Sequence, residues 1–285
     1  MADGAPQIVR SKAEMIEISS VLRASGETIG LVPTMGYLHP GHLSLVKLSK
    51  ENASKTVVYI FVNPKQFNVG ADLESYPRDE ERDIALLSEL SVDYVFIPDG
   101  SAIYPDGYES SGVLSKLTEG FEGAGRPGHF EGVTTVLSIF FHIVNPHFAV
   151  FGEKDFQQLR VVEKMVSDLA FPMDILRGPL VRESDGLAMS SRNVLLNPQQ
   201  RKVATVISKA LFSASREILE SDVKAVKKNA LAELDKEQII SSEYFEVADE
   251  KTLEPVERKS VDKGVVICVA ARIGDVRLID NVIIS

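Results

Sequence analysis

Cysteine is almost absent from this chain, since Cys268 is the only one among 285 residues. A single cysteine cannot form an internal disulfide, and the apolar run around it, 265–270, predicts a small buried side chain. Long apolar stretches are also lacking. Residues 1–10 contain no signal-peptide core, and no stretch is long enough to cross a bilayer. We therefore expect a cytoplasmic protein without a membrane partner.

Positive charge is scarce as well. The chain has 31 Lys and Arg residues and 41 Asp and Glu residues, which gives a formal net charge of −10. The basic residues are scattered along the chain, and this disfavours a nucleic-acid partner held through many phosphates. A local cationic pocket for a small polyphosphate stays compatible with this balance, because net charge says little about one cleft.

Strand and helix patterns alternate along the first 180 residues. Short β-branched runs predict strands at 28–32, 55–62, 92–98, 148–151 and 173–176. Apolar residues at helical spacing predict a helix from the capping box at 11–14 to Gly26, and others at 42–52, 79–90, 133–144 and 156–169. The fold class is therefore α/β, a Rossmann-like doubly wound parallel sheet with ligands beyond the carboxyl ends of its strands.

The last third of the chain has a different pattern. Asn197 and Pro198 start a long helix that runs towards residue 219, and a second helix covers 224–234. Strands follow at 244–247 and 265–270. We expect a smaller C-terminal α+β domain, so that the domains are residues 1–180 and 181–285.

The segment 33–42 reads Pro-Thr-Met-Gly-Tyr-Leu-His-Pro-Gly-His and follows a predicted strand. Its two histidines, His39 and His42, lie at the start of a helix, where unpaired N–H groups and the helix dipole favour a phosphate. Imidazole can donate hydrogen bonds to phosphate oxygens as charge builds on them. The alternatives are a metal pair or two surface histidines. Zinc is disfavoured because no third ligand follows at the usual spacing.

Two further segments lie in the first half of the chain. Asn63 and Gln66 directly follow a strand and offer amide groups suited to a small hydroxy acid, although a turn with a solvated amide is the alternative. Asp83 is a candidate to orient hydrated Mg²⁺, which prefers oxygen ligands, while the alternative is a solvent-facing aspartate on a helix.

Residues 123–128 match the dinucleotide fingerprint G-x-G-x-x-G, but we regard the match as false. Phe148 stands about where that fold needs a ribose-binding acid, and Pro127 interrupts the turn. We expect a mobile loop here. Arg126 and His129, in the same stretch of chain, can meet anionic groups of a substrate.

Two distal segments carry the remaining candidates. In the first, Lys154 can neutralise developing phosphate charge, and Gln158 lies one helical turn further on. In the second, Val181 precedes the cluster Met189-Ser190-Ser191-Arg192, whose hydroxyls and guanidinium can hold phosphates and close over them as a lid. For this cluster the alternative is a polar cap to the next helix.

Taken together and in order, these segments resemble the pantothenate synthetase (pantoate–β-alanine ligase) family of the HIGH-motif nucleotidylyltransferase superfamily. The matching motifs are P-T-M-G with H-x-G-H, N-P-x-Q-F, D-L-x-x-Y-P-R, R-P-G-H-F, G-E-K-D-x-Q-Q and M-S-S-R. They span Leu31 to Asn193, whereas the C-terminal third matches mainly in length and pattern. One residue departs from the family pattern: His142 stands where the family usually has asparagine. If that asparagine makes a structural bond, His142 weakens the packing there.

The resemblance implies an ATP-dependent ligase that condenses (R)-pantoate with β-alanine through a pantoyl-adenylate intermediate, releasing AMP and pyrophosphate. It implies that the catalytic residues are His39, His42, Lys154, Ser190, Ser191 and Arg192. The ATP site would add Met35 and Val181 beside the adenine, together with Gly36, Tyr37, Leu38, Pro40, Gly41, Gly152, Glu153, Asp155 and Met189. Pantoate and β-alanine would contact Gln66, Gln158, Asn63, Arg126 and His129. Mg²⁺ would be the cofactor, with Asp83 as its candidate residue, and the protein would be a homodimer.

Three rivals fit part of the pattern. A nucleotidylyltransferase that keeps the transferred nucleotide on its product also carries H-x-G-H. A nucleotide-binding regulatory module without turnover is disfavoured by the retained lysine and histidines. A tRNA synthetase is disfavoured because the chain is short and acidic and has no evident tRNA-binding domain.

Overall fold

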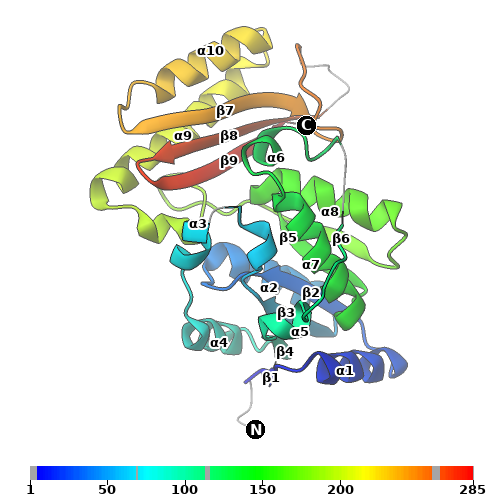
Figure 1. Ribbon diagram of the computed structural model, residues 1–285. Coiled ribbons are helices and arrows are strands. Elements are labelled where there is room, and N and C mark those ends of the chain that lie inside the picture. The colour runs from blue at the N-terminus through cyan, green and yellow to red at the C-terminus, as the bar shows by residue number, and fades with distance from the viewer. Residues whose placement is uncertain (1–4, 69, 113–115, 259–263, 285) are drawn as a thin grey trace. The chain divides into compact units, whose positions relative to one another are not determined.

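The computed structural model describes residues 5–68, 70–112, 116–258 and 264–284. The chain folds into two compact units (Figure 1). Unit 1 consists of Met1–Leu114, Arg126–Glu153 and Val161–Pro179, and unit 2 of Ser115–Gly125, Lys154–Arg160 and Leu180–Ser285. Two short segments of the first 180 residues thus group with the C-terminal part. The division into domains 1–180 and 181–285 stays a prediction.

Unit 1 is built on a six-stranded sheet in which every pairing is parallel. Its strands are β1 (Gln7–Val9), β2 (Ile29–Thr34), β3 (Lys55–Ile60), β4 (Tyr94–Phe96), β5 (Phe148–Gly152) and β6 (Asp174–Gly178). The predicted α/β class with a parallel sheet is confirmed. The sequence analysis missed β1, because a three-residue strand is too short to show a period.

The strand order of this sheet is β1-β4-β3-β2-β5-β6. The order therefore reverses between β2 and β5, which pair directly through Gly30 with Phe148 and Leu31 with Ala149. In a doubly wound sheet the reversal opens a crevice at the carboxyl ends of the two strands, where ligands bind. The segment after β2 contains the two histidines, and Gly152 ends β5.

Helices connect these strands. They are α1 (Lys12–Ala24), α2 (Pro40–Asn52), η1 (Pro64–Gln66), α3 (Gly70–Ser75), α4 (Glu80–Glu89), α5 (Gly100–Ile103), α7 (His129–Val144), η2 (Glu153–Asp155) and α8 (Phe156–Asp168). Two of them begin earlier than predicted, since α2 starts at Pro40 and α7 at His129. Apolar periodicity alone cannot show these first turns, because they contain Gly, His or Pro. Val32, Val58, Val95 and Val150 of the strands pack with Leu45, Val46 and Leu87 of the helices in the core.

Unit 2 contains an antiparallel sheet in the order β7-β8-β9. Its elements are α6 (Phe121–Gly125), η3 (Ser191–Leu195), α9 (Pro198–Glu217), α10 (Val223–Leu234), β7 (Ile240–Asp249), β8 (Val265–Ile273) and β9 (Val276–Ile284). The long helices α9 and α10 pack on this sheet (Figure 1), where Ile207 and Leu211 of α9 join Phe245 and Val269 in one buried cluster. The smaller α+β part is confirmed, but β9 was not predicted. Its apolar run is interrupted by Asp280 and Asn281, both of which are buried.

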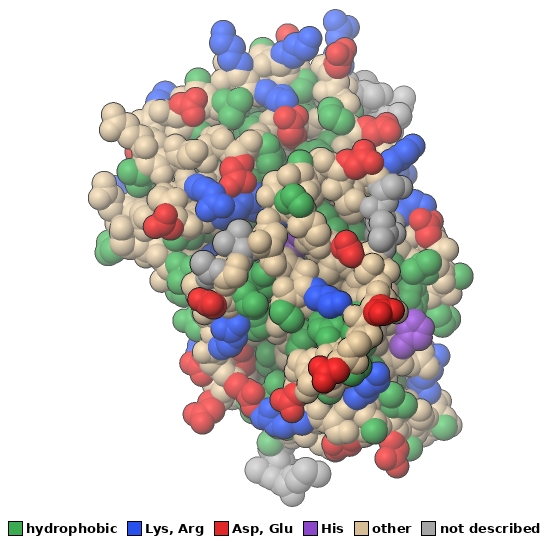
Figure 2. Space-filling model, viewed as in Figure 1, with side chains coloured by type: hydrophobic (Ala, Val, Ile, Leu, Met, Phe, Trp, Pro, Cys, Tyr) green, Lys and Arg blue, Asp and Glu red, His purple; other side chains and the backbone are tan. Residues whose placement is uncertain are grey.

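No helix within the described part of the chain is long and apolar enough to cross a membrane. On the face drawn in Figure 2, acidic and basic side chains alternate over the surface, and the basic ones do not gather into a stripe.

His147 closes the amino-terminal end of the central strands in unit 1. Its Nδ1 accepts a hydrogen bond from the backbone N–H of Ile29 at 2.9 Å, and its own backbone N–H donates to the Ile29 carbonyl at 2.8 Å. The Arg23 guanidinium lies 3.5 Å from the same Nδ1. Burial, and secondly the charge of Arg23, lower the pKa of His147 below its ordinary value.

Protonation of His147 is therefore expected to destabilise the fold. The pKa is lower in the folded protein than in the unfolded chain, where it is about 6.5. The stability that neutral His147 contributes is fully present above the unfolded pKa and is lost as the pH falls from there through the folded pKa. In His147→Asn, Oδ1 takes the place of Nδ1 without titrating. We expect its free energy of unfolding, measured by urea denaturation, to depend less on pH between about 5 and 7.

The matched control is His142→Asn, because His142 is an exposed histidine near the end of α7. The bond from the Ile29 N–H to His147 stays intact in this variant, so the loss of stability on protonation of His147 should persist. If His147→Asn and the wild type lose stability equally on acidification, the role given to His147 is wrong.

Candidate active site

The segment after β2 turns sharply before α2 begins. Thr34 at the end of the strand accepts a hydrogen bond from the Gly36 N–H at 3.2 Å. Gly36 and Tyr37 both have left-handed backbones, with φ of 81° and 51°. The left-handed conformation is unfavourable by about 1 kcal/mol or more for a residue with a side chain. Tyr37 therefore needs stabilising contacts to keep it.

Asp83 on α4 supplies that support. Its Oδ2 accepts from the Tyr37 N–H at 2.6 Å and its Oδ1 from the Leu38 N–H at 2.7 Å. The side chain is only 1% exposed, and the Arg82 guanidinium lies over the Tyr37 ring. A methyl group on Gly36 would lie 3.1 Å from Asp83 Oδ2, so glycine also allows the carboxylate to approach. Asp83 thus holds the turn that leads to the two histidines.

The role of Asp83 in orienting hydrated Mg²⁺ stays a prediction. Both carboxylate oxygens are engaged by backbone amides, and burial raises the pKa of the group against the effect of those hydrogen bonds. Mg²⁺ prefers water-rich, octahedral oxygen sites. Among the described residues, no three His, Cys, Asp or Glu side chains are grouped so that they could hold a metal ion.

The two histidines cap α2 reciprocally. His39 is the N-cap, and its Nδ1 accepts from the Gly41 N–H at 3.2 Å, while His42 Nδ1 accepts from the His39 N–H at 3.4 Å. The ring centroids are 4.0 Å apart. Because each Nδ1 is an acceptor, the proton of each neutral ring lies on Nε2. The predicted histidine pair is therefore present at the start of a helix. The capping hydrogen bonds to Nδ1 place the N–H of each neutral ring on Nε2.

A side-chain hydrogen bond links the loop after β3 to the histidine loop. Gln66, which is 8% exposed, donates from Nε2 to the Met35 sulfur at 2.7 Å. Asn63, 1% exposed, donates to Gln66 Oε1 at 3.2 Å and to the Gly132 carbonyl at 3.0 Å. Gly132 is required here, because a methyl group would lie 2.2 Å from the Lys65 carbonyl. The structure thus brings Asn63, Gln66 and Met35 together.

The start of α7 joins the same cluster. His129 donates from Nδ1 to the Gln66 carbonyl at 2.8 Å, so its Nε2 can accept from the Arg126 guanidinium 3.2 Å away. Arg126 also reaches the Gln66 carbonyl at 3.4 Å. Both predicted residues therefore pack against the backbone that carries Gln66.

Tyr104 is a member of this cluster that the sequence analysis missed. Its hydroxyl donates to Asn63 Oδ1 at 2.8 Å, which fixes the Asn63 amide with its nitrogen towards Gln66. Burial raises the pKa of Tyr104, so the hydroxyl stays protonated and keeps this donor. Tyr104 lies 41 residues from Asn63 in the chain and belongs to no recognisable motif, so no sequence signal pointed to it.

The G-E-K-D segment is divided between the units. Gly152 and Glu153 end a segment of unit 1, and Lys154 opens a segment of unit 2. In unit 2 the Lys154 ammonium lies 3.4 Å from Asp155, and the Lys154 carbonyl accepts from the Asn281 amide at 2.8 Å. Gln158 is half-buried one turn into α8.

Gln157 forms hydrogen bonds with residues 117–122, which precede the predicted loop. This residue, which was not predicted, is 5% exposed and donates to the carbonyls of Leu117 and Gly120 at 2.7 and 2.9 Å. It also accepts from the Glu122 N–H. Residues 123–125 of the expected loop therefore belong to the short helix α6, and the mobility of the loop stays a prediction.

The remaining candidates lie on a small hairpin of unit 2. The Met189 N–H donates to the Val181 carbonyl at 3.0 Å, so these two predicted residues are neighbours. Ser190 then caps η3 by accepting from the Arg192 N–H at 3.3 Å, and Ser191 is buried. The alternative that this cluster caps the next helix is realised for Ser190, although the helix is η3 and not α9. A capping role and phosphate binding are compatible.

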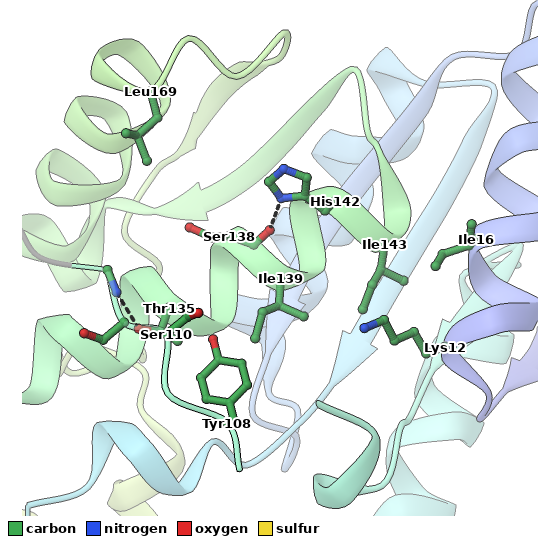
Figure 3. A pocket seen from close by; sticks show the side chains of 12 residues that line it. Lys12, Ile16, Tyr108, Ser110, Thr135, Ser138, Ile139, His142, Ile143 and Leu169 are labelled. Atoms are coloured by element: carbon green, nitrogen blue, oxygen red, sulfur yellow. Dashed lines mark hydrogen bonds between the residues drawn. The ribbon is translucent and has the colours of Figure 1, made fainter. Parts of the chain in front are cut away.

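A groove of about 440 Å³ lies elsewhere on unit 1, beside α7. Figure 3 shows Ile139, Ile143 and Leu169 around it, together with His142, which donates from Nδ1 to the Ser138 carbonyl at 2.7 Å. None of the predicted site residues is among the described residues that line it. His142 is exposed and bonded within its own helix. The expectation that it weakens packing stays a prediction.

Comparisons with known proteins point to one family. Residues 7–283 match the model of the family described as Pantoate-beta-alanine ligase. A pantothenate synthetase from Acetivibrio thermocellus is 45% identical over 281 residues, which cover 98% of this chain and 99% of the relative. The crystal structure of pantothenate synthetase from Thermus thermophilus superposes with a TM-score of 0.90 at 41% identity, covering 97% and 98% of the two chains. The pantoate-beta-alanine ligase from Francisella tularensis, complexed with beta-gamma ATP and beta-alanine, has a TM-score of 0.79 at 32% identity and covers 98% and 97%.

Replacing Asp83 by Asn tests its role in the turn. The amide nitrogen of Asn cannot accept a hydrogen bond, so one of the two backbone N–H groups, of Tyr37 or Leu38, loses its partner. We expect the free energy of unfolding to fall by about 1–3 kcal/mol. Hydrogen exchange of residues 35–39 should become faster.

Asp79→Asn is the matched control on the same helix, since Asp79 is the N-cap of α4 and accepts from the Arg82 N–H at 3.1 Å. Asn caps helices as well as Asp, so stability should change little. Equal stability of the Asp83 and Asp79 variants would contradict the role assigned to Asp83.

Proposed function

The chain belongs to the pantoate–β-alanine ligase family, and we propose that it condenses (R)-pantoate with β-alanine at the cost of ATP, which is cleaved to AMP and pyrophosphate. The observation that carries this proposal is the reciprocally capped histidine pair at the start of α2. It presents two Nε2–H donors where a helix dipole already favours a phosphate.

In the first step, a carboxylate oxygen of pantoate attacks the α-phosphorus of ATP. A new P–O bond forms, the bond from the α-phosphorus to the bridging oxygen breaks, and pyrophosphate leaves with the electron pair. Negative charge grows on the phosphate oxygens, and we propose that His39 and His42 donate hydrogen bonds to them through Nε2. Donors that are fixed in advance stabilise the transition state without reorganising.

Two side chains are proposed to supply positive charge for the same step. Lys154 and Arg192 are the cations, and Ser190 and Ser191 are hydroxyl donors for the departing phosphates. The backbone of Met35 and Val181 would border the adenine. Mg²⁺ would arrive bound to the ATP phosphates, as it commonly does. Asp83, whose carboxylate oxygens each accept one backbone N–H of the turn, is kept as the candidate to orient this hydrated Mg²⁺.

The second step consumes the adenylate. The amine of β-alanine, which must be neutral, attacks the acyl carbon; the C–N bond forms, the C–O bond to AMP breaks, and the amine loses a proton. We propose that Gln66 and Asn63, supported by Tyr104, His129 and Arg126, hold pantoate in place. The family resemblance adds Gln158 to the pantoate contacts. Fixing both reactants in line can supply much of the rate enhancement.

Three further proposals rest on the sequence pattern and the family resemblance. They are the division into domains at residue 180, a homodimer, and a cytoplasmic location.

The decisive assay is pyrophosphate release from Mg·ATP with pantoate alone, followed by addition of β-alanine and mass spectrometry of the products. We expect a stoichiometric burst of pyrophosphate, then turnover that yields pantothenate and AMP only when the amine is present. If ATP binds but pantoate elicits no pyrophosphate, the ligase assignment fails. A nucleotidylyltransferase acting on a phosphorylated acceptor would then be tested.

The histidine pair can be tested separately from helix stability. His39→Asn keeps an N-cap acceptor in place of Nδ1, so stability should change by less than about 0.5 kcal/mol. The variant lacks the Nε2–H donor, and we expect kcat for pyrophosphate release to fall by roughly 10²–10³-fold. His39→Ala is the comparison variant, which should lose the donor and also about 1 kcal/mol of stability. Wild-type kcat in His39→Asn would show that the ring serves only as a cap.

A further inference from the structure

The edge strand β9 carries three polar side chains in an otherwise apolar run. They are Arg277, Asp280 and Asn281, and the last two are only 3% and 4% exposed. Burying a polar group is unfavourable unless it finds a partner. The hydrogen-bond partners of these side chains therefore show which segments of unit 2 are bound to β9.

Asn281 holds Lys154. Its Nδ2 donates to the Lys154 carbonyl at 2.8 Å, and this contact lies within unit 2 although Lys154 follows the β5 strand of unit 1 in sequence. The boundary between the units falls between Glu153 and Lys154. A hydrogen bond to the backbone of Lys154 fixes the direction in which its side chain leaves the chain.

Asp280 holds the hairpin that leads to Ser190. Arg182 binds it with two parallel hydrogen bonds, of 2.7 and 2.9 Å, and also donates to the carbonyls of Asn281 and Gly186. Arg182 pairs with Ala188 across the hairpin, whose end is Met189. A forked ion pair of this kind fixes orientation as well as distance.

Arg277 binds the segment 116–125 through Glu122. It donates to both carboxylate oxygens of Glu122, at 2.6 and 2.7 Å, and the Tyr244 hydroxyl donates to the same carboxylate at 2.8 Å. Gln157, three residues after Lys154, also binds this segment, through the Glu122 N–H and the carbonyls of Leu117 and Gly120. The segment around Lys154 is thus tied to β9 directly through Asn281 and indirectly through Glu122.

Strand geometry explains how one strand reaches all three segments. Residues four apart share a face of a strand, and neighbours face opposite ways. Arg277 and Asn281 therefore lie on one face of β9 and Asp280 on the other, and the regular pairing with β8 preserves this alternation. Helix α9 packs on the sheet, and its Phe212 lies under the Arg182 guanidinium.

We propose that Arg277, Asp280 and Asn281 are positioning residues, which hold Lys154 and the hairpin before Ser190-Ser191-Arg192 in one body. The groups of unit 2 that bind the ATP phosphates then keep a fixed spacing. This inference rests on the proposed function, since it assigns β9 a role in presenting those groups. None of the three side chains has to touch a substrate.

Asn281→Ala is the sharpest test, because it removes one amide without leaving a buried charge. We expect kcat for pyrophosphate release to fall by roughly 10–100-fold, since small misplacements of a catalytic group have effects of this size. KM for pantoate should change by less than about threefold. Asn229→Ala is the control in the same unit, where an exposed amide donates to Glu217 at 2.6 Å. It should keep wild-type kcat.

The double variant separates positioning from a general loss of structure. If Asn281 acts through Lys154, then Asn281→Ala should lower single-turnover rates by less than about threefold in a Lys154→Ala background. A loss of the same factor in both backgrounds would overturn the proposal. So would a kcat of Asn281→Ala within about twofold of the wild type.

Hydrogen exchange in the substrate-free protein supplies a readout that does not need the activity. Asn281→Ala should speed exchange in residues 154–160 and leave residues 203–215 of α9 unchanged. If wild-type protein makes no pantothenate, the proposed function fails. The hydrogen bond from Asn281 to Lys154 is then tested by hydrogen exchange alone. Unchanged exchange in residues 154–160 would then overturn it.

Discussion

The direction and order of the strands in the parallel sheet form the constraint on which unit 1 depends. Because all its strands are parallel, their carboxyl ends share one edge, and in doubly wound sheets ligands bind where the strand order reverses, which here is between β2 and β5. The histidine turn follows β2, the Asn63–Gln66 loop follows β3, and Gly152 ends β5. A single topological feature thus gathers segments that are far apart along the chain.

Within that frame, buried polar contacts decide the local geometry. The left-handed Gly36–Tyr37 turn is unfavourable by itself and is held by the carboxylate of Asp83. The amides of Asn63 and Gln66 are oriented by Tyr104, by the Gly132 carbonyl and by Met35. In both cases a side chain outside the motif fixes the backbone or amide of the motif. Such supporting contacts are what make a reactive group a rigid one.

In unit 2, polar side chains of strand β9 also fix the segments that carry the candidate residues. The phosphate-binding candidates lie on short segments, and two buried side chains of β9 hold these segments: Asn281 binds Lys154, and Asp280 binds the hairpin before Ser190. Buried ion pairs contribute little net stability, because desolvation offsets most of the attraction. Their retention at Asp280 and Glu122 is better explained by the geometry they impose. These partners also explain the sequence of the edge strand β9. Its apolar pattern is interrupted at the residues that bind the neighbouring segments.

The sequence by itself determined the α/β class, five of the six parallel strands, the smaller α+β part and the motifs that mark the family. These rest on local periodicity and on fixed spacings, which a linear chain records directly. Only the tertiary structure decided that Asp83 serves the histidine turn, that Tyr104 orients Asn63, and that Lys154 groups with β9. Each of these contacts joins residues 41 to 127 positions apart, and no local pattern encodes such a partner. Strand β9 was missed for the same reason, because Asp280 and Asn281 look like a break in the strand until their buried partners are known.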